Sequence, residues 1–373
     1  MTRLFVDIHV LQTVPPSNIN RDDTGSPKTA VYGGVRRARV SSQAWKRATR
    51  VAFADQFDAA DLGVRTKRAV QLLADAIADH SPALTDRAVQ LATDALEAAG
   101  LKIAPAKKAK EAPGEVGYLV FLSRSQIQNL ADAAISAASA DDPRKAMRAA
   151  KIKQFVDTDH SVDIALFGRM VTDQKDLSVD AAAQVAHAIS VHPVETEFDY
   201  FTAVDDQNTA EESGAGMLGT VEFNSSTLYR YATVNVTQLL QNLGSPSATT
   251  RAVEAFVDCF VRSMPTGKQN AFGNRTLPEA VVVLVRDTQP INLAGAFETP
   301  VREMAAEGRV KRAAEALRSE ALETQRAFGE TPVAGWVTRV GSDTEALDEL
   351  GGNVPLPQLV HGLGELVASR ISS

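Results

Sequence analysis

Two long stretches interrupt an otherwise regular series of strand-like and helix-like segments, and they constrain the fold most strongly. Residues 63–156 form an alanine-rich block whose apolar periodicity is helical. Residues 194–223 have two β-prone arms around a glycine-rich centre, a pattern typical of a long hairpin. Because both stretches lie inside the series, the sequence predicts a mixed α+β core with two insertions. An antiparallel sheet with helices on one face would fit this order.

The N-terminal region supplies the first strands and a helix. Residues 3–11 alternate apolar and polar side chains, so we expect a half-buried strand there. A polar loop follows over 12–29, and Gly33-Gly34 then turns the chain into a strand at 35–40. Ser41 or Ser42 is a good N-cap for a helix over 43–55.

The remaining segments are predicted in the same way. Within the helical block, Ser81-Pro82 and Asp142-Pro143 each resemble an N-cap followed by proline at the first helical position. The Pro- and Lys-rich residues 104–117 are expected to form an exposed loop. Later segments are expected to be a strand at 162–171, a helix at 179–189, a strand at 229–236, a helix that reaches Cys259, a strand at 280–286 and then predominantly helical sequence.

Composition limits the class of protein. The chain has 373 residues, 44% of them hydrophobic and 23% charged, which is ordinary for a soluble globular protein of two or three domains. No apolar run approaches the ~20 residues that span a bilayer, and the N-terminus does not have the pattern of a signal peptide. The single cysteine, Cys259, excludes an intramolecular disulfide and is expected to be buried. These features together predict a cytoplasmic location and no membrane partner.

Charge is distributed unevenly along the chain. The net charge is −7, yet residues 21–50 carry eight basic and two acidic side chains, a net +6 that leaves −13 for the rest. A basic patch on an acidic body indicates a polyanion-binding surface; the alternative is a solvated strand and helix. Arg36 and Arg39 could also be ion-pair partners of the acidic remainder. The eight basic residues are Arg21, Lys28, Arg36, Arg37, Arg39, Lys46, Arg47 and Arg50.

The predicted helix after Ser41 is suited to bind phosphates. Trp45 and Thr49 fall on its apolar side, and Lys46, Arg47 and Arg50 lie within an arc elsewhere. Its first turn adds free backbone N–H groups and the positive end of the helix dipole. Nothing in this pattern requires that bases be read. The hairpin stretch is the opposite: it contains eight acidic residues and no basic one, so it is expected to act by shape and apolar contact.

Several motifs, in order, resemble one family. They are INRDD, the loop lysine Lys28, YGGVRRARVSSQAWKRA, VDIALFGRM, AHAISVH, DYFTAVDD, GTVEFNSSTLYRYATVNV and NLAGAFE. Together they are similar to the CasC family, the repeated backbone subunit of the type I-E CRISPR Cascade complex. The resemblance is dense over 1–52 and 160–236 and fainter to about 300.

This resemblance implies a fold and an assembly. It implies an RRM-like (ferredoxin-like) palm with an inserted helical finger domain and a β-hairpin thumb. The palm would comprise 1–62, 157–193 and 224–373 with C-terminal helices, the finger 63–156 and the thumb 194–223. Such subunits have no catalytic centre or cofactor. Their partners would be CRISPR RNA, copies of the same chain, target DNA paired with the guide, and other Cascade subunits of the CasA, CasB, CasD and CasE types.

The resemblance also assigns roles to residues. Met170 in FGRM and Phe201-Thr202 in the hairpin fall where the family wedges into RNA and displaces a nucleotide at intervals. Lys268 in TGKQ is predicted as an extra contact, whereas AFETPVREMAAEG is less basic than a second phosphate patch would be. Positions expected to hold the RNA backbone are Arg21, Lys28, Ser41, Gln43, Lys46, Arg47 and Arg50.

Two alternatives stay open from the sequence. The run DTDHSVD, with Asp157, Asp159, His160 and Asp163, could bind a metal for phosphodiester hydrolysis together with His187 and His192, although no HExxH-like spacing occurs. His9 and His187 are expected to be hydrogen-bonded structural residues. The second alternative is a scaffold that assembles without nucleic acid, with the acidic hairpin of one copy on the basic platform of the next.

Overall fold

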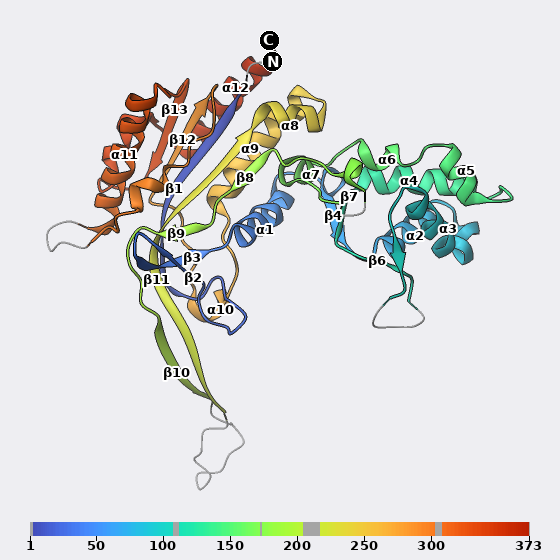
Figure 1. Ribbon diagram of the computed structural model, residues 1–373, viewed down its shortest axis with the longest axis horizontal. Coiled ribbons are helices and arrows are strands. Elements are labelled where there is room, and N and C mark those ends of the chain that lie inside the picture. The colour runs from blue at the N-terminus through green and yellow to red at the C-terminus, as the bar shows by residue number, and fades with distance from the viewer. Residues whose placement is uncertain (1–2, 107–111, 172–173, 204–216, 303–307, 373) are drawn as a thin grey trace, which may run out of the picture. The chain divides into compact units, whose positions relative to one another are not determined.

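The computed structural model describes residues 3–106, 112–171, 174–203, 217–302 and 308–372 (Figure 1). The chain divides into two compact units, each assembled from separate parts of the sequence. Unit 1 comprises Met1–Ala52, Gln184–Asn235 and Val253–Ser373, and unit 2 comprises Phe53–Ala183 and Val236–Ala252. Residues 157–183, which the family resemblance places in the palm, belong to unit 2 together with the helical block.

Unit 1 is built on a large sheet in the order β14-β13-β12-β1-β11-β9-β3-β2, with β10 and β8 also paired to β11. All of the registered pairs are antiparallel except β13 with β14. The strands are β1 (Phe5–Ser17), β2 (Thr29–Tyr32), β3 (Val35–Val40), β8 (Ala183–Val185), β9 (Ala188–Ser190), β10 (Glu197–Ala203), β11 (Met217–Asn235), β12 (Ala280–Arg286), β13 (Ala334–Arg339) and β14 (Gly352–Asn353).

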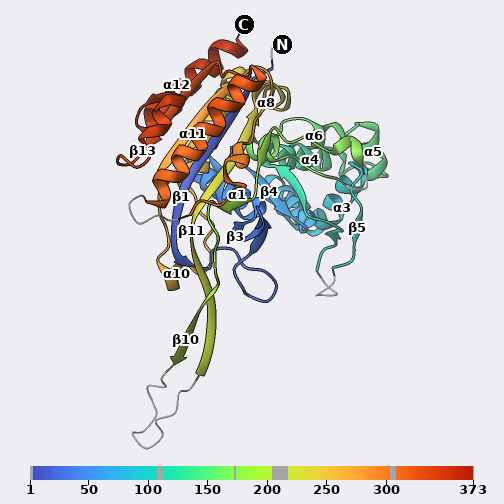
Figure 2. The ribbon, with the colours of Figure 1, turned by 60° about the vertical axis from the view of Figure 1, so that its left-hand side comes forward.

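Helices cover both faces of this sheet, so the prediction of helices on one face was wrong. On one face, Leu11, Tyr229 and Val282 pack with Ala314 and Leu317 of α11 (Arg309–Phe328), which Figure 2 shows lying along the sheet. On the other face, Arg230 stacks on aromatic rings from α1 (Ser42–Ala52) and α9 (Pro246–Arg262). Most residues of β1, including the whole run Val6–Gln12, are therefore buried, although its alternation alone predicts one solvated face.

The predicted hairpin is an extension of the central sheet. β10 pairs with the first part of β11, from Glu197↔Phe223 to Ala203↔Met217. β11 is one strand of 19 residues, and its second part, from Asn224 to Asn235, pairs with β1. The hairpin arm and the strand predicted at 229–236 are thus a single element. Residues 204–216, including the glycine-rich centre, lie outside the described residues.

Unit 1 contains several further helices and 3₁₀ turns. The C-terminal region contains β13 and β14 between its helices, so the prediction of predominantly helical sequence there was only partly right. Cys259 is buried in α9, as predicted. Besides α1, α11 and the second half of α9, these elements are α10 (Gln269–Phe272), α12 (Leu356–Ile371) and the 3₁₀ turns η5 (Leu293–Phe297) and η6 (Glu345–Leu350).

Unit 2 is mainly helical, with a core of alanine, leucine, isoleucine and valine side chains. Asp142 caps α5 by accepting a hydrogen bond from the Lys145 amide at 2.9 Å, as predicted, whereas Ser81 precedes a 3₁₀ turn and makes no side-chain cap. The helices are α2 (Ala69–His80), α3 (Ala88–Ala98), α4 (Arg124–Ala137), α5 (Pro143–Ala149), α6 (Gln154–Asp157), α7 (Val162–Phe167), α8 (Val236–Leu243) and the first part of α9.

Short strands and turns complete unit 2. The predicted exposed loop at 104–117 begins and ends in the small β5–β6 ladder, and its residues 107–111 are not among those described. The strands are β4 (Gly63–Thr66), β5 (Ile103–Ala104), β6 (Glu115–Val116) and β7 (Val120–Ser123), and the 3₁₀ turns are η1 (Phe53–Asp55), η2 (Ala59–Asp61), η3 (Pro82–Arg87) and η4 (Lys175–Leu177).

Two predicted elements have the wrong type. The strand predicted at 162–171 begins as the helix α7, whose residues Val162–Leu166 are all buried, so its sequence shows no periodicity that separates helix from strand. The helix predicted at 179–189 is extended and contains β8 and β9. Its alanines favour a helix locally, but pairing with β11 and β3 determines the strand. No helix of the described residues is long and apolar enough to cross a bilayer.

Candidate nucleic-acid interface

Helix α1 is held to unit 1 by a buried arginine. The guanidinium of Arg230 lies 3.7 Å from the Trp45 ring centroid and 4.5 Å from that of Phe260. It donates hydrogen bonds to Gln12 Oε1 at 2.5 Å and to the Phe260 carbonyl. Trp45 and Thr49 are fully buried, so the apolar side of α1 predicted from the sequence is confirmed. This anchoring fixes which side of α1 faces solvent.

The basic side of α1 faces outward. Arg47 is exposed, and Lys46 and Arg50 are half-buried. Burial lowers the pKa of the Lys46 ammonium. Because a lysine that is partly desolvated gains more from an anion than a fully hydrated one, Lys46 is a suitable phosphate ligand.

Ser41, rather than Ser42, occupies the N-cap position of α1. Its hydroxyl accepts a hydrogen bond from the Ala44 amide at 3.3 Å, and its own amide donates to Asn20 Oδ1 at 2.8 Å. Ser41 is therefore buried and largely used in holding the helix and the preceding loop together. Gln43, one residue into the first turn, is exposed and open to a ligand.

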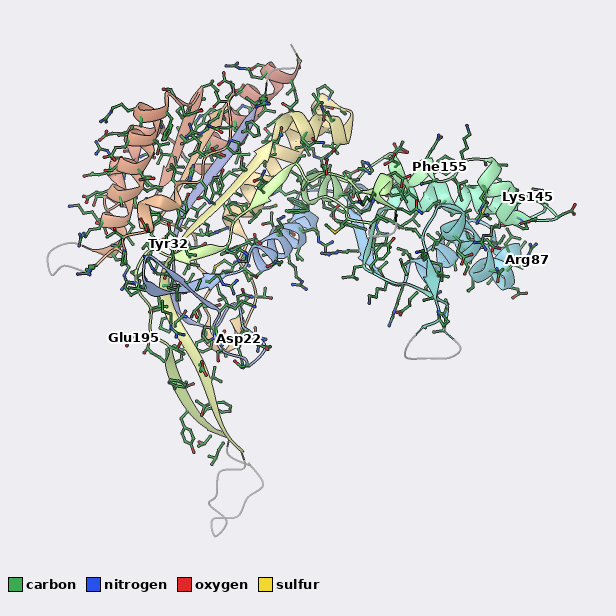
Figure 3. All side chains as sticks on the ribbon, in the orientation of Figure 1. Asp22, Tyr32, Arg87, Lys145, Phe155 and Glu195 are labelled. Carbon is green, nitrogen blue, oxygen red and sulfur yellow. The ribbon has the colours of Figure 1, made fainter. Side chains whose placement is uncertain are left out.

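The loop before β2 is ordered by its own hydrogen bonds. The Asp22 carboxylate accepts from the Thr24 amide at 2.9 Å, the Thr24 hydroxyl at 2.7 Å and the Ser26 amide at 3.0 Å, and these bonds lower its pKa, the Thr24 side chain most strongly (Asp22 in Figure 3). Arg21 bridges Pro27 through the backbone and remains exposed. Asp22, which would oppose RNA phosphates, is thus used to shape the loop.

Lys28 and Lys268 are brought to the same loop. The Lys28 amide donates to the Asn20 carbonyl at 2.9 Å, and its carbonyl accepts from the Arg39 amide at 2.9 Å, which ties the loop to β3. Gly267 lies against the loop so closely that a Cβ there would be 2.3 Å from the Ile19 carbonyl oxygen. Gly267 lines, with residues 19–25, an open hollow of about 500 Å³. Lys268, the next residue, therefore sits beside the Arg21 loop.

Arg37 does not belong to the surface patch. It is fully buried and donates to the carbonyls of Tyr32 at 3.1 Å, Ser190 at 2.9 Å and Phe297 at 2.8 Å. Gly33 packs against this arrangement: its φ is +60°, and a Cβ would lie 1.7 Å from the Glu298 carbonyl oxygen. The double-glycine turn thus allows the protein's own NLAGAFE segment to pack closely against it. Because Arg37 is buried, the net charge of residues 21–50 overstates how basic the surface is.

The two other arginines of β3 differ from Arg37. Arg36 is exposed. Arg39 donates to the Thr29 carbonyl at 3.2 Å and contacts His187 Nδ1 at 3.2 Å, so these partners are neutral groups rather than the carboxylates considered from the sequence. His187 lies between β8 and β9. The prediction that it lies on a helix was therefore wrong.

The hairpin places Phe201 and Thr202 on opposite faces, because they are successive residues of β10. The Phe201 ring lies over Gly219, where a Cβ would be 2.4 Å from its Cζ, and it is 36% exposed. Three exposed apolar side chains share the Thr202 face: Phe198, Tyr200 and Leu218. The alternation of Phe198, Asp199 and Tyr200 is the sequence signal that could have revealed two of them.

Met170 lies in unit 2, after α7. It is 83% exposed, but both neighbours in the chain, Arg169 and Val171, are buried. Met170 is therefore accessible to solvent, and its predicted contact with RNA stays a prediction.

Two of the residues considered for metal binding, Asp163 and His160, have structural hydrogen bonds. Asp163 Oδ1 accepts from the Gly63 amide at 2.9 Å and the Ser161 hydroxyl at 2.6 Å. His160 Nδ1 lies 3.1 Å from Gln126 Nε2, and burial lowers its pKa. In the part of the chain that the structure describes, no three His, Cys, Asp or Glu side chains are arranged to hold a metal. His9 contacts the Tyr229 hydroxyl at 2.9 Å, the structural role predicted for it.

Comparison with known proteins supplies the family. Residues 6–361 match the model of the family described as CT1975-like protein. A solved chain from a "CRISPR RNA-guided surveillance complex, pre-nicking" has 35% identity and a TM-score of 0.85 and covers 97% of this chain and 100% of its own. A second, from a "CRISPR RNA-guided surveillance complex", has 30% identity, a TM-score of 0.73 and coverages of 96% and 99%. No curated protein matches. These matches confirm the resemblance that the sequence motifs carry.

Proposed function

This chain belongs to the CT1975-like protein family, and we propose that it is a non-catalytic, CasC-type backbone subunit of a type I-E CRISPR surveillance complex. In this role it binds CRISPR RNA in the cytoplasm through the phosphates. One observation carries the proposal: α1 is locked by the Arg230–Trp45 stack with its basic side toward solvent, next to the self-bonded Arg21 loop. Cations on rigid elements are suited to hold a polyanion in one register.

The RNA-contacting surface of unit 1 comprises two groups. Arg21, Lys28 and Lys268 would bind phosphates at the loop. Gln43, Lys46, Arg47 and Arg50 would bind them along α1, and the Ser41 amide–Asn20 bond would keep loop and helix in fixed relation. None of these groups is arranged to read base edges, so sequence recognition is left to pairing between the guide and target DNA.

The hairpin and Met170 would act by shape. Acidic residues such as Glu197 and Asp199 make the hairpin a poor phosphate ligand, so its apolar side chains would contact bases. In this proposal Phe201, Thr202 and Met170 unstack RNA and displace one nucleotide at intervals. Apolar wedges commonly do this at a cost of on the order of a few kcal/mol per step.

The domain names follow from the same proposal. Unit 1 contains the RRM-like palm with the β10–β11 hairpin as thumb, and unit 2 contains the helical finger. Copies of the chain would associate head to tail along the RNA, an arrangement that forms an open helix when it does not close. Further partners would be Cascade subunits of the CasA, CasB, CasD and CasE types.

The test removes charge from α1. In Lys46→Ala/Arg47→Ala, RNA affinity should fall, and the slope of log K against log salt should shrink by about 0.7 for each lost phosphate contact, because fewer counterions are released. Fluorescence anisotropy of a labelled single-stranded RNA at several salt concentrations measures both. The matched control, Arg326→Ala/Arg370→Ala, removes equal charge from α11 and α12.

Two outcomes would count against the proposal. An unchanged salt slope in the α1 variant would show that α1 does not bind RNA phosphates. Filaments of RNA-free protein in electron micrographs, with no dependence on added RNA, would favour the scaffold alternative instead.

A further inference from the structure

Met170 is exposed, but its place in the chain is tightly held. An exposed methionine by itself needs no explanation, since single apolar residues are common on surfaces. Here, however, it is 83% exposed between Arg169 at 3% and Val171 at 2%. The chain is therefore buried immediately before and immediately after the one side chain that points to solvent.

Arg169 binds four separate parts of unit 2. Its Nε donates to the Leu177 carbonyl at 2.8 Å and its Nη2 to the Val156 carbonyl at 2.7 Å. Its Nη1 lies 3.3 Å from Gln126 Oε1 and 3.4 Å from the Phe121 carbonyl oxygen. Because a guanidinium is planar and its donors point in fixed directions, these bonds determine both the position and the orientation of Arg169.

The backbone on either side is equally constrained. Arg169 and Val179 exchange backbone hydrogen bonds of 3.0 and 2.8 Å. Gly168 has φ 77° and ψ 167°, and a Cβ there would lie 2.8 Å from the Val179 carbonyl oxygen. On the far side, the Val171 amide donates to Ser178 Oγ at 3.2 Å. Met170 therefore projects from a corner with fixed backbone before and after it.

The acceptors of Arg169 in the described residues are neutral. Burial lowers its pKa to about 10, so the side chain remains charged at neutral pH. Burying a cation without a carboxylate bound to it is unfavourable, and an apolar side chain of similar volume would often do as well for stability. An apolar side chain, however, has no N–H groups. It could not make the directional hydrogen bonds by which Arg169 joins β7, α4, α6 and η4 to the residue before Met170.

We propose that Arg169 is a positioning residue for Met170, which it holds in the solvent-facing place from which the thioether enters the bound RNA. The inference rests on the proposed function, because it takes Met170 to be an RNA-contacting side chain. A backbone ordered in advance loses less conformational entropy on binding, so insertion of the side chain that it carries into the RNA is more complete.

The experiment uses the full chain assembled on a synthetic single-stranded RNA with 2-aminopurine at successive positions. Fluorescence of 2-aminopurine rises where a base is unstacked, so the wild type should give maxima at intervals. We expect Met170→Ala and Arg169→Met each to lower the maxima due to the Met170 contact by at least about two-fold while Kd changes by less than about three-fold, since phosphate contacts dominate affinity. Arg169→Lys should behave as Arg169→Met, because an ammonium lacks the fork.

A control separates positioning from general loss of stability. Leu130→Ala removes a fully buried side chain from the same core and should leave the maxima unchanged, although unit 2 becomes less stable. If Leu130→Ala lowers the maxima as much as Arg169→Met, the positioning role is wrong. It is also wrong if Arg169→Lys retains the wild-type maxima, which would assign the effect to charge.

The remaining outcomes distinguish this inference from the proposed function. If Met170→Ala lowers the maxima and Arg169→Met does not, Arg169 has no positioning role and the wedge stands. If neither variant changes them, the wedge role of Met170 fails, and with it the role of Arg169, while the phosphate platform of unit 1 is untouched.

Discussion

Each unit contains a buried arginine directly behind an element predicted to contact RNA, and the two are used differently. In unit 1, Arg230 lies over the rings of Trp45 and Phe260 and supports α1 by cation–π stacking. In unit 2, Arg169 donates to carbonyl groups and a side-chain amide and supports Met170 by directional bonds. Burial lowers the pKa of both, to about 9 and about 10.

The difference corresponds to what each element has to present. A helix can present a row of cations if its apolar side is held against the core of the domain. Stacking on aromatic rings is sufficient for this, because the torsion angles of individual side chains need not be fixed. One side chain on a connecting segment needs its backbone fixed in direction, which hydrogen bonds provide and stacking does not.

The largest effect is expected from Gly168→Ala. Its φ of 77° with ψ of 167° falls in a region that is essentially restricted to glycine, and a Cβ would meet the Val179 carbonyl. We expect a loss of about 2–3 kcal/mol in the free energy of unfolding of unit 2. Urea denaturation followed by far-UV circular dichroism measures this. Gly117→Ala, where nothing lies within 4 Å, should change it by less than about 0.5 kcal/mol; equal effects would contradict the rigid corner.

Arg230→Lys should have the next largest effect. An ammonium cannot stack as a plane between two rings, so we expect unit 1 to lose about 2 kcal/mol. Trp45 and Trp336 both lie in unit 1, so tryptophan fluorescence during urea denaturation reports on it. Arg339→Lys, in a partly exposed ion pair with Asp348, is the control and should lower stability much less than Arg230→Lys. A loss at Arg230 no greater than at Arg339 would show that stacking is unimportant.

A smaller effect concerns acid. Unit 1 buries another basic group, His9, whose pKa burial lowers to about 3, whereas the unfolded chain takes up its proton near 6.5. Stability is therefore lost as pH falls through 6.5, by on the order of 1 kcal/mol between pH 7.5 and 5.5. The difference between wild type and His9→Asn isolates this contribution, since burial raises the pKa of Asp7 and acts in the opposite direction. Parallel pH profiles for the two proteins would refute it. Arg169 keeps its proton throughout this range, so it adds no such dependence to unit 2.

Local sequence determined the elements whose pattern is complete within a few residues. The strand at 35–40, the helix that begins after Ser41 and the Asp142 cap were all predictable, because alternation, capping groups and proline act over one or two turns. The series of motifs identified the family, and it includes most of the basic residues of 21–50.

Tertiary structure alone decided which side chains of those elements are buried and which are exposed. Arg36 and Arg37 are adjacent and chemically identical, yet one is exposed and the other is bound by carbonyls from distant segments. The local sequence around β8 and β9 is typical of a helix, but pairing with β11 and β3 makes these residues extended. The supporting roles of Arg230 and Arg169 depend on rings and carbonyls that are far from them in the chain. Burial and pairing are properties of several segments together, so no local pattern contains them.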